Sequence, residues 1–382
     1  MPSAITIHEV DTSRRREVMR FISLPFAIYQ GCPQWVPPVM PDARMQLNRE
    51  KNGFYRQNDA AFFIAQRGGR DVARIAALHP IYYNKFKGTN EAHFYLFDSF
   101  DDQEAAHAVL DAAADWARAR GLDLLRGPLG FMAFDGFGLL AKGFEHRPAN
   151  GIPYNHDYYP RLVESWGFEL EERVYSGYVK INDLLANFPE RVLQIAEKVR
   201  KRYGFEVRTY KNKRELVKNV VAPMVRLYNE TLTHIAGDPP VAEEEVQVIV
   251  DSILLIAKPD MLKFIAKGDE LVGFLFSFPN IAEGLRRCGG RVLTPWGLFH
   301  LFRAMRTTKW IDLNGMGILP RYQGAGGTAL LYAELYRTLA AYNRFEHADV
   351  VQISEFNVKS LNEMKSFGVD FYKTHHIYRR AI

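Results

Sequence analysis

Apolar positions in the last third of the chain recur with the spacings of short, alternating strands and helices. The run from Trp310 to Ile318 places an apolar side chain at every second or third position and ends before a proline, which predicts a strand. After a glycine-rich stretch, Leu330, Leu331 and Leu335 recur at helical spacing. The pattern then continues with a β-rich run, a helix opened by an asparagine and a closing strand, at 348–353, 357–367 and 368–379.

The glycine-rich stretch between the strand and the helix has the composition of an anion-binding turn. Successive backbone N–H groups of such a turn converge on a phosphate, and the helix that follows contributes its positive end. The stretch lacks the Gly-Lys-Ser/Thr of a nucleotide-hydrolysing P-loop and the glycine spacing of a dinucleotide site. We therefore expect a phosphate-binding turn of another kind. Its residues are Gln323, Gly324, Ala325, Gly326, Gly327 and Thr328.

This turn resembles the pyrophosphate loop of the GNAT acyltransferases, whose pattern is Gln or Arg, two residues, Gly, one residue, then Gly or Ala. The pattern falls on Gln323, Gly326 and Thr328, with Thr328 in place of the usual small residue. The resemblance covers residues 205–382. It implies acyl-CoA as co-substrate, held by the turn and by the strand before it. The cofactor-binding residues that it implies outside the turn are Met316, Gly317, Ile318 and Asn357.

The first half of the chain carries signs of a second, degenerate copy of the same module. Phe63 to Gln66 is similar to Phe264 to Lys267 at an offset of 201, and Gly167-Phe168 is similar to Gly368-Val369 at the same offset. The glycine turn has no counterpart near Gly127. We expect an α/β (α+β) fold of tandem GNAT-like modules, each a mixed, mostly antiparallel sheet flanked by helices. The expected modules span 1–180 and 181–382.

Composition narrows the class of protein further. The 382 residues are enough for two cores, and 47% of them are hydrophobic. Two cysteines, no N-terminal signal and no apolar run of membrane-spanning length predict a protein on the cytoplasmic side. The net charge is +5, and basic residues are concentrated between Lys198 and Lys218. These residues are compatible with binding to an anionic membrane, to nucleic acid or to the phosphates of coenzyme A, and equally with a helix face that is simply solvated. No metal-ligand spacing and no Gly-x-Ser-x-Gly nucleophile turn is present, so metal and covalent routes are disfavoured.

An amphipathic segment from Trp296 to Trp310 lies where a compact module of this kind would use a tight turn. Leu298, Leu301, Phe302 and Met305 share one expected helical face, with Arg303 and Arg306 off that face. Such a basic segment with a tryptophan at each end suits the surface of a bilayer, although a packed core helix has the same apolar spacing. The segment favours peripheral contact with the inner membrane surface over a nucleic-acid partner.

Three side chains are candidates for proton transfer. Glu355 follows the second strand and precedes Asn357, so its carboxylate is a candidate base for the attacking amine. His234, in the expected loop from Thr233 to Pro240, is the second candidate. Many GNAT modules place a tyrosine acid seven residues after the asparagine, but Met364 stands there in this chain. Either the thiolate leaves without that acid, or Tyr372 supplies the proton, or the module does not catalyse transfer.

As a whole, the chain resembles the two-module GNAT proteins of bacteria, a group that includes the bacterial ceramide synthases. The resemblance rests on the turn, on the segment from Asp349 to Asn357 and on the ending from Tyr372 to Arg379, with Arg126-Gly127-Pro128 in the first half. It implies an acyl-CoA-dependent N-acyltransferase acting on a long-chain lipid amine, a sphingoid base. The alternatives are an acetyltransferase of a small soluble amine, a Fem-type aminoacyltransferase and a non-catalytic acyl-CoA-binding protein.

Overall fold

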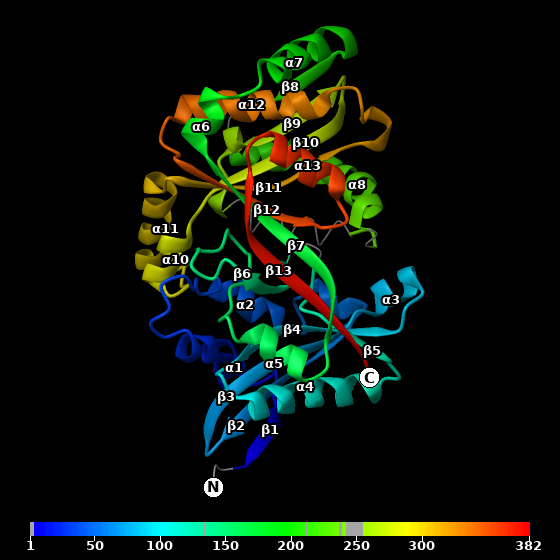
Figure 1. The fold of residues 1–382 in the computed structure, drawn as a ribbon, viewed down its shortest axis with the longest axis vertical. Coiled ribbons are helices and arrows are strands. Elements are labelled where there is room, and N and C mark those ends of the chain that lie inside the picture. Colours follow the sequence, from blue (N-terminus) through cyan, green and yellow to red (C-terminus); the bar gives the residue numbers. More distant parts are fainter. Residues whose placement is uncertain (1–3, 133–134, 211, 237–238, 242–254) are drawn as a thin grey trace. The chain divides into compact units, whose positions relative to one another are not determined.

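The computed structural model describes residues 4–132, 135–210, 212–236, 239–241 and 255–382 (Figure 1). The chain divides into two compact units. The first unit comprises Met1–Tyr175, Ala282–Arg303 and Tyr372–Ile382, and the second comprises Ser176–Ile281 and Ala304–Phe371. The division falls inside strand β7, five residues before the boundary expected at 180, and two later segments return to the first unit.

The first unit contains a mixed sheet with the strand order β1-β2-β3-β4-β5-β13, in which only β4 and β5 are parallel. Strand β6 pairs with β13. The elements are β1 Ile5–Glu9, α1 Arg15–Ile28, α2 Met40–Gln46, η1 Gly53–Arg56, β2 Asp59–Arg67, β3 Arg70–His79, α3 Ile81–Lys87, β4 Glu91–Ser99, α4 Gln103–Arg118, β5 Leu124–Gly127, β6 Leu139–Lys142, α5 Tyr159–Ser165, β7 Glu169–Lys180, α10 Ala282–Cys288, α11 Pro295–Thr307 and β13 Asp370–Ala381, of which β7, α11 and β13 extend into the second unit.

Strand β2 shows why this sheet is covered on both faces. Phe62 and Ile64 belong to the buried cluster that includes Phe21 of α1, whereas Phe63 and Ala65 belong to the cluster built around α4. Because side chains alternate along a strand, the continuous apolar run of β2 supplies both layers. Helix α4 packs across β2 and β3 (Figure 1).

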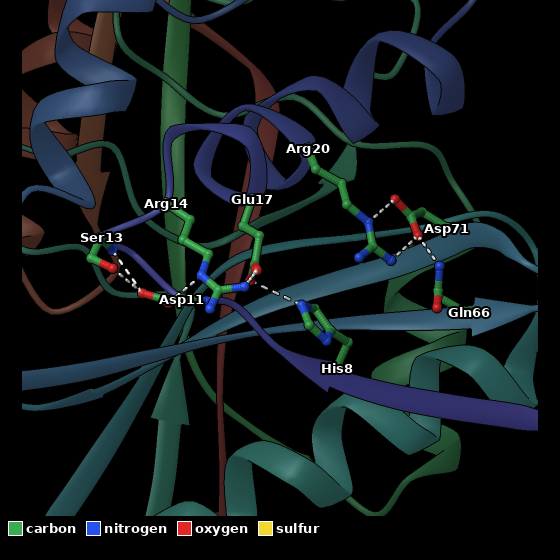
Figure 2. A network of polar contacts seen from close by, with 8 residues as sticks. All are labelled: His8, Asp11, Ser13, Arg14, Glu17, Arg20, Gln66 and Asp71. Atoms are coloured by element: carbon green, nitrogen blue, oxygen red, sulfur yellow. Dashed lines mark hydrogen bonds and ion pairs between the residues drawn. The ribbon is translucent and has the colours of Figure 1, made fainter.

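A polar network fastens helix α1 to strands β1 and β3 in the first unit (Figure 2). The Glu17 carboxylate accepts from the Asp11 backbone N–H at 2.8 Å and lies 3.0 Å from Nε2 of His8. Arg20 donates to Asp71 through Nε at 2.7 Å. These groups are partly exposed, so each pair contributes little free energy. They connect α1 to β1 and β3, and none of them belongs to the site described below.

The second unit contains the strand order β12-β11-β10-β9-β8, in which only β11 and β12 are parallel. Helices α8 and α12 cover opposite faces, because Gly317 lies under Thr231 of α8 while its neighbour Ile318 lies against the start of α12. The elements are α6 Ile181–Ala186, α7 Glu190–Tyr203, β8 Phe205–Arg208, α8 Lys213–Ala236, η2 Pro259–Met261, β9 Leu262–Lys267, β10 Glu270–Pro279, β11 Trp310–Ile318, η3 Pro320–Tyr322, α12 Gly327–Tyr342, β12 His347–Ser354 and α13 Val358–Ser366. The strand, turn, helix, strand and helix expected between 310 and 367 are all present.

Candidate functional site

Strands β11 and β12 separate part-way along the second unit. Their parallel register runs from the pair Trp310 and His347 to the pair Leu313 and Val350 and ends there, although β11 continues to Ile318 and β12 to Ser354. Beyond that point, Met316, Gly317 and Ile318 of β11 pair with β10. Backbone groups of Met316–Ile318 on the β12 side are therefore outside the β11–β12 register. We call the space between the two diverging strand ends the opening.

A β-bulge lies where the strands separate. Leu275 and Ser277 of β10 pair with Met316 and Leu313 of β11, so three residue steps on β11 oppose two on β10. Gly315 lies within the bulge at a φ of 88°, in the left-handed region that favours glycine. A bulge bends the strand that carries it, which turns the end of β11 away from β12.

The turn after β11 leads directly into α12. The Leu319 N–H donates to the Val272 carbonyl at 2.9 Å, and the Gln323 side-chain amide donates to the Ile318 carbonyl at 3.2 Å. Gly326 is the N-cap of α12 at a φ of 82°, and no side chain caps the helix. The first N–H groups of a helix have no acceptor inside it. They and the helix dipole make the turn a candidate site for an anion such as pyrophosphate.

The glycines of this site have different roles. A Cβ on Gly324, whose φ is 76°, would meet no atom within 4 Å, so this residue borders open space. A Cβ on Gly326 would lie 2.5 Å from Cγ2 of Val199 in α7, and one on Gly327 would lie 2.9 Å from Cδ1 of Ile318. Gly317 is covered in the same way, by Thr231 Oγ1 at 2.9 Å. Packing therefore requires three of these glycines, and a ligand that approaches the turn meets Gly324.

The two turn glycines with positive φ are Gly324 and Gly326, three and five residues after Arg321. The same loop spacing also falls on Arg321, Gly324 and Gly326, where a small residue stands at the last position. Arg321 itself donates to Glu230 at 2.8 Å and to Glu270. Hydrogen bonding to Glu230 raises the pKa of Arg321. This arginine thus anchors the turn to α8 and to the β9–β10 hairpin.

Helix α7 brings positive charge beside the turn. It packs along α12 (Figure 1), with Arg200 of α7 2.5 Å from Glu334 and Glu197 of α7 2.9 Å from Arg337. Because Gly326 lies against Val199, the C-terminal half of α7 is next to the start of α12. That half exposes Lys198, Lys201 and Arg202, whose charge favours an anion at the turn. Part of the basic stretch between the modules is therefore part of the candidate site.

Glu355 and Asn357 lie in the connection between β12 and α13. Glu355 is half-buried in the turn that follows the strand. Asn357 is the N-cap of α13, and its side-chain oxygen accepts from the Ser360 N–H at 3.2 Å. Its capping bond explains why an asparagine stands here, independently of any ligand. Met364, at the position of the expected tyrosine, packs against the core of the unit.

The other two candidate residues lie on other elements. His234 lies in the last turn of helix α8, which ends at Ala236, and not in a loop as expected; its side chain lies outside the described residues. Tyr372 belongs to the first unit, where its ring lies 4.5 Å from that of His146. The order of strands in the sequence predicts Tyr372 in the second module. The structure differs because membership of a unit depends on contacts that are distant in sequence.

Glu363 of α13 is a candidate that the sequence analysis missed. Burial raises the pKa of its carboxyl group, and nearby Lys359 opposes this rise. A carboxylic acid with a raised pKa on the helix opened by Asn357 is a candidate donor for a leaving thiolate. The Glu363 side chain is half-buried, and this partial burial, which no local sequence pattern shows, is the signal that identifies it.

The first unit has the same strand geometry without the open turn. There β4 carries a like bulge, with Arg74 and Ala76 of β3 opposite Asp98 and Tyr95, and the pairing of β4 with β5 ends at His93 and Arg126. Leu96 lies in this bulge at a φ of 48°. The recurrence of bulge and strand separation supports an internal repeat.

Two features block an anion site in the first unit. The Leu129 N–H donates to the Phe94 carbonyl at 3.0 Å, so the chain itself occupies the space beside β4. The Asp102 side chain caps α4 by accepting from the Ala105 N–H at 3.1 Å, and Glu104 adds charge in the first turn. The Asp102 carboxylate, which is itself paired with Arg67, thus already occupies the N-terminal end of α4.

Comparison with known proteins shows what the whole chain is similar to. No family model matches the chain. It is 26% identical over 388 aligned positions to bacterial ceramide synthase from Caulobacter vibrioides, covering 96% of this chain and 95% of that one. It is 24% identical over 374 residues to protein YghO from Escherichia coli K12, covering 96% and 94%. A tandem GNAT protein from the clavulanic acid biosynthesis pathway superposes with a TM-score of 0.57 at 12% identity, covering 99% of this chain and 98% of that one.

The chain has the tandem GNAT fold. The expected fold class is thereby confirmed, as is the resemblance to the two-module proteins that include bacterial ceramide synthase. A glucosamine N-acetyltransferase region of a fungal β-N-acetylglucosaminidase also superposes with a TM-score of 0.57, at 10% identity, over all of this chain and 38% of that one. No helix within the described ranges is long and apolar enough to cross a membrane. In the same ranges, no group of three or more His, Cys, Asp or Glu side chains could hold a metal ion.

Proposed function

We propose that this GNAT-fold protein is an acyl-CoA-dependent N-acyltransferase whose donor site is the opening between β11 and β12 with the turn at Gly324. The observation that carries the proposal is the combination of an uncapped α12 N-terminus with backbone groups on Met316–Ile318 that are not paired with β12. The relationship to bacterial ceramide synthase and the tandem GNAT fold support an acyltransferase.

The residues of the second unit fit a coenzyme A thioester. The N–H groups of the turn would hold its pyrophosphate, assisted by the charges of α7, and the bound thioester would supply an activated acyl group. Backbone donors of β11 would polarise the carbonyl oxygen as negative charge develops on it. Holding an amine next to that carbonyl accounts for much of the rate in such a reaction.

Two protons move when an amine displaces a thiolate. The nitrogen loses one as the new C–N bond forms, and the sulfur gains one as the C–S bond breaks. Glu355 is the proposed base, because it follows β12 at the end of the opening. His234 and water are the other candidates for the base, and Glu363 or Tyr372 for the acid.

We assign a long-chain lipid amine of the sphingoid class as the acceptor. This rests on the similarity to bacterial ceramide synthase over nearly the full length of both chains. A non-catalytic acyl-CoA-binding protein is the second candidate, favoured by Met364 at the position of the expected acid.

The test is product analysis by mass spectrometry with purified protein. Palmitoyl-CoA and a sphingoid base should give the N-acyl amide, and acetyl-CoA with glucosamine should give little product. If only the reaction with glucosamine gives product, the acceptor is a soluble amine and the lipid acceptor is refuted. Bound coenzyme A without product from either amine would favour the non-catalytic candidate. The absence of coenzyme A binding would refute the donor site.

A further inference from the structure

Helix α11 has two apolar faces, and only one of them is buried. Leu301 and Met305 are 0% and 6% exposed, so they do not form the outer face for which the sequence pattern selected them. Phe302, expected on the same face, is instead 51% exposed. The side chains that reach solvent recur every third residue, and we call them the aromatic face: Leu293 at 69% exposed, Trp296 at 62%, Phe299 at 53% and Phe302 at 51%.

The aromatic face is ordered by contacts around a buried histidine. The rings of Trp296 and Phe299 lie 5.8 Å apart and nearly parallel. The ring of His300, which is 6% exposed, meets Trp296 edge-on at 4.2 Å and Phe299 at 5.3 Å. Neither ring nitrogen of His300 has a hydrogen-bond partner in the described part of the chain. Two large rings are thus held outward at the solvent although burial would favour them by about 1.5–3 kcal/mol each.

The stretch of chain that carries this face is basic. From Gly284 to Ile311 it contains no Asp or Glu and six Arg or Lys residues. Three of these, Arg286, Arg287 and Lys309, pair with Glu283 or Glu346 outside the stretch. Arg291 precedes the helix and is exposed, and Arg306, one turn after Phe302, is exposed as well. A large exposed apolar patch marks an interaction site, and a cationic border selects an anionic partner.

We propose that the aromatic face of α11 docks on the surface of an anionic phospholipid bilayer. Tryptophan prefers the level of the lipid headgroups, phenylalanine and leucine enter the acyl region, and arginines pair with anionic headgroups. Because Leu301 and Met305 remain buried, docking needs no unfolding of the helix. The inference deepens the proposed function, since a long-chain amine resides in a bilayer.

Flotation of the full-length protein with vesicles tests the docking directly. The unmodified protein should float with phosphatidylcholine–phosphatidylglycerol vesicles at low salt and lose this binding as salt rises. The double variant Trp296→Ala/Phe299→Ala should bind about tenfold more weakly or worse. Phe86→Ala, at a phenylalanine that is 49% exposed on α3 of the first unit, is the matched control and should bind like the unmodified protein.

Charge is tested separately. Arg291→Glu and Arg306→Glu should each weaken binding about thirtyfold, because each changes two charges at about 1 kcal/mol apiece, whereas Arg16→Glu, at an exposed arginine of α1, should not. Equal flotation with neutral vesicles, or unchanged flotation of the Trp296→Ala/Phe299→Ala variant, would overturn the proposal. So would a dimer that this variant dissociates while vesicle binding persists, because the face would then contact a second copy. None of these readouts depends on acyl transfer, so the docking and the proposed function can fail independently.

Discussion

Gly326 at the start of α12 lies so close to Val199 of α7 that a Cβ would stand 2.5 Å from the valine Cγ2. A glycine in a phosphate-binding turn is usually assigned to the ligand. Here the helix–helix contact requires Gly326, and the neighbouring Gly324 borders the open side of the turn. Tests of the site therefore need to separate ligand effects from packing effects.

Gly324→Asp should weaken coenzyme A binding by about tenfold or more, because a carboxylate near a phosphate opposes it by ~1–4 kcal/mol. Gly324→Asn is the matched control, since both side chains tolerate a positive φ and only one is charged. Titration calorimetry should give one site per chain for the unmodified protein, because Asp102 caps the corresponding helix of the first unit. Equal affinities of the two variants would remove the turn from the site.

Gly326→Ala should destabilise the second unit by about 2 kcal/mol or more, from overpacking and from a positive φ. Val199→Ala in the same chain should recover part of that loss, since it removes the methyl group in the way. Denaturant unfolding of both single variants and the double variant measures this coupling. If the changes in the free energy of unfolding of the two single variants add up to that of the double variant, the two residues are not in the contact described.

Glu355→Gln should lower turnover about a hundredfold or more while leaving acyl-CoA affinity within a factor of about two, because the amide keeps the shape but accepts no proton. Retention of turnover in the variant would move the base to His234 or to water.

His375 should make the first unit less stable in mild acid. Burial lowers the pKa of this histidine from 6.5 to about 3, and its ring lies 3.2 Å from the Pro153 carbonyl. The unfolded chain then binds the extra proton between these pH values, so stability is complete above about pH 6.5 and falls below it.

The size of this effect is best measured against His375→Gln, which can still donate to Pro153. The advantage of the unmodified protein over the variant should shrink by about 2 kcal/mol from about pH 7 to about pH 5. The comparison cancels other titrating groups, such as Asp135, whose pKa burial raises to about 6. A constant difference between the two proteins would mean that His375 titrates normally.

The sequence alone determined the order of strands and helices in the second unit, the existence of the turn at 323–328 and the relationship between the halves. These features follow from local rules: alternation along strands, helical spacing after Gly326 and the glycine content of the turn. Even the helix at 295–307 was predictable from its spacing.

Only the tertiary structure decided which residues of these elements are buried in the core and which are exposed to solvent. The spacing of α11 is compatible with burying either apolar side, and packing placed Leu301 inside and Trp296 outside. The turn has several glycines of equal local character, and the neighbouring helix α7 distinguished Gly326 from Gly324. Tyr372 and the end of the chain joined the first unit through pairing of β13 with β5. A local sequence pattern shows the periodicity of apolar residues. The burial of a residue depends on partners that are far away along the chain, so the sequence pattern alone did not determine it.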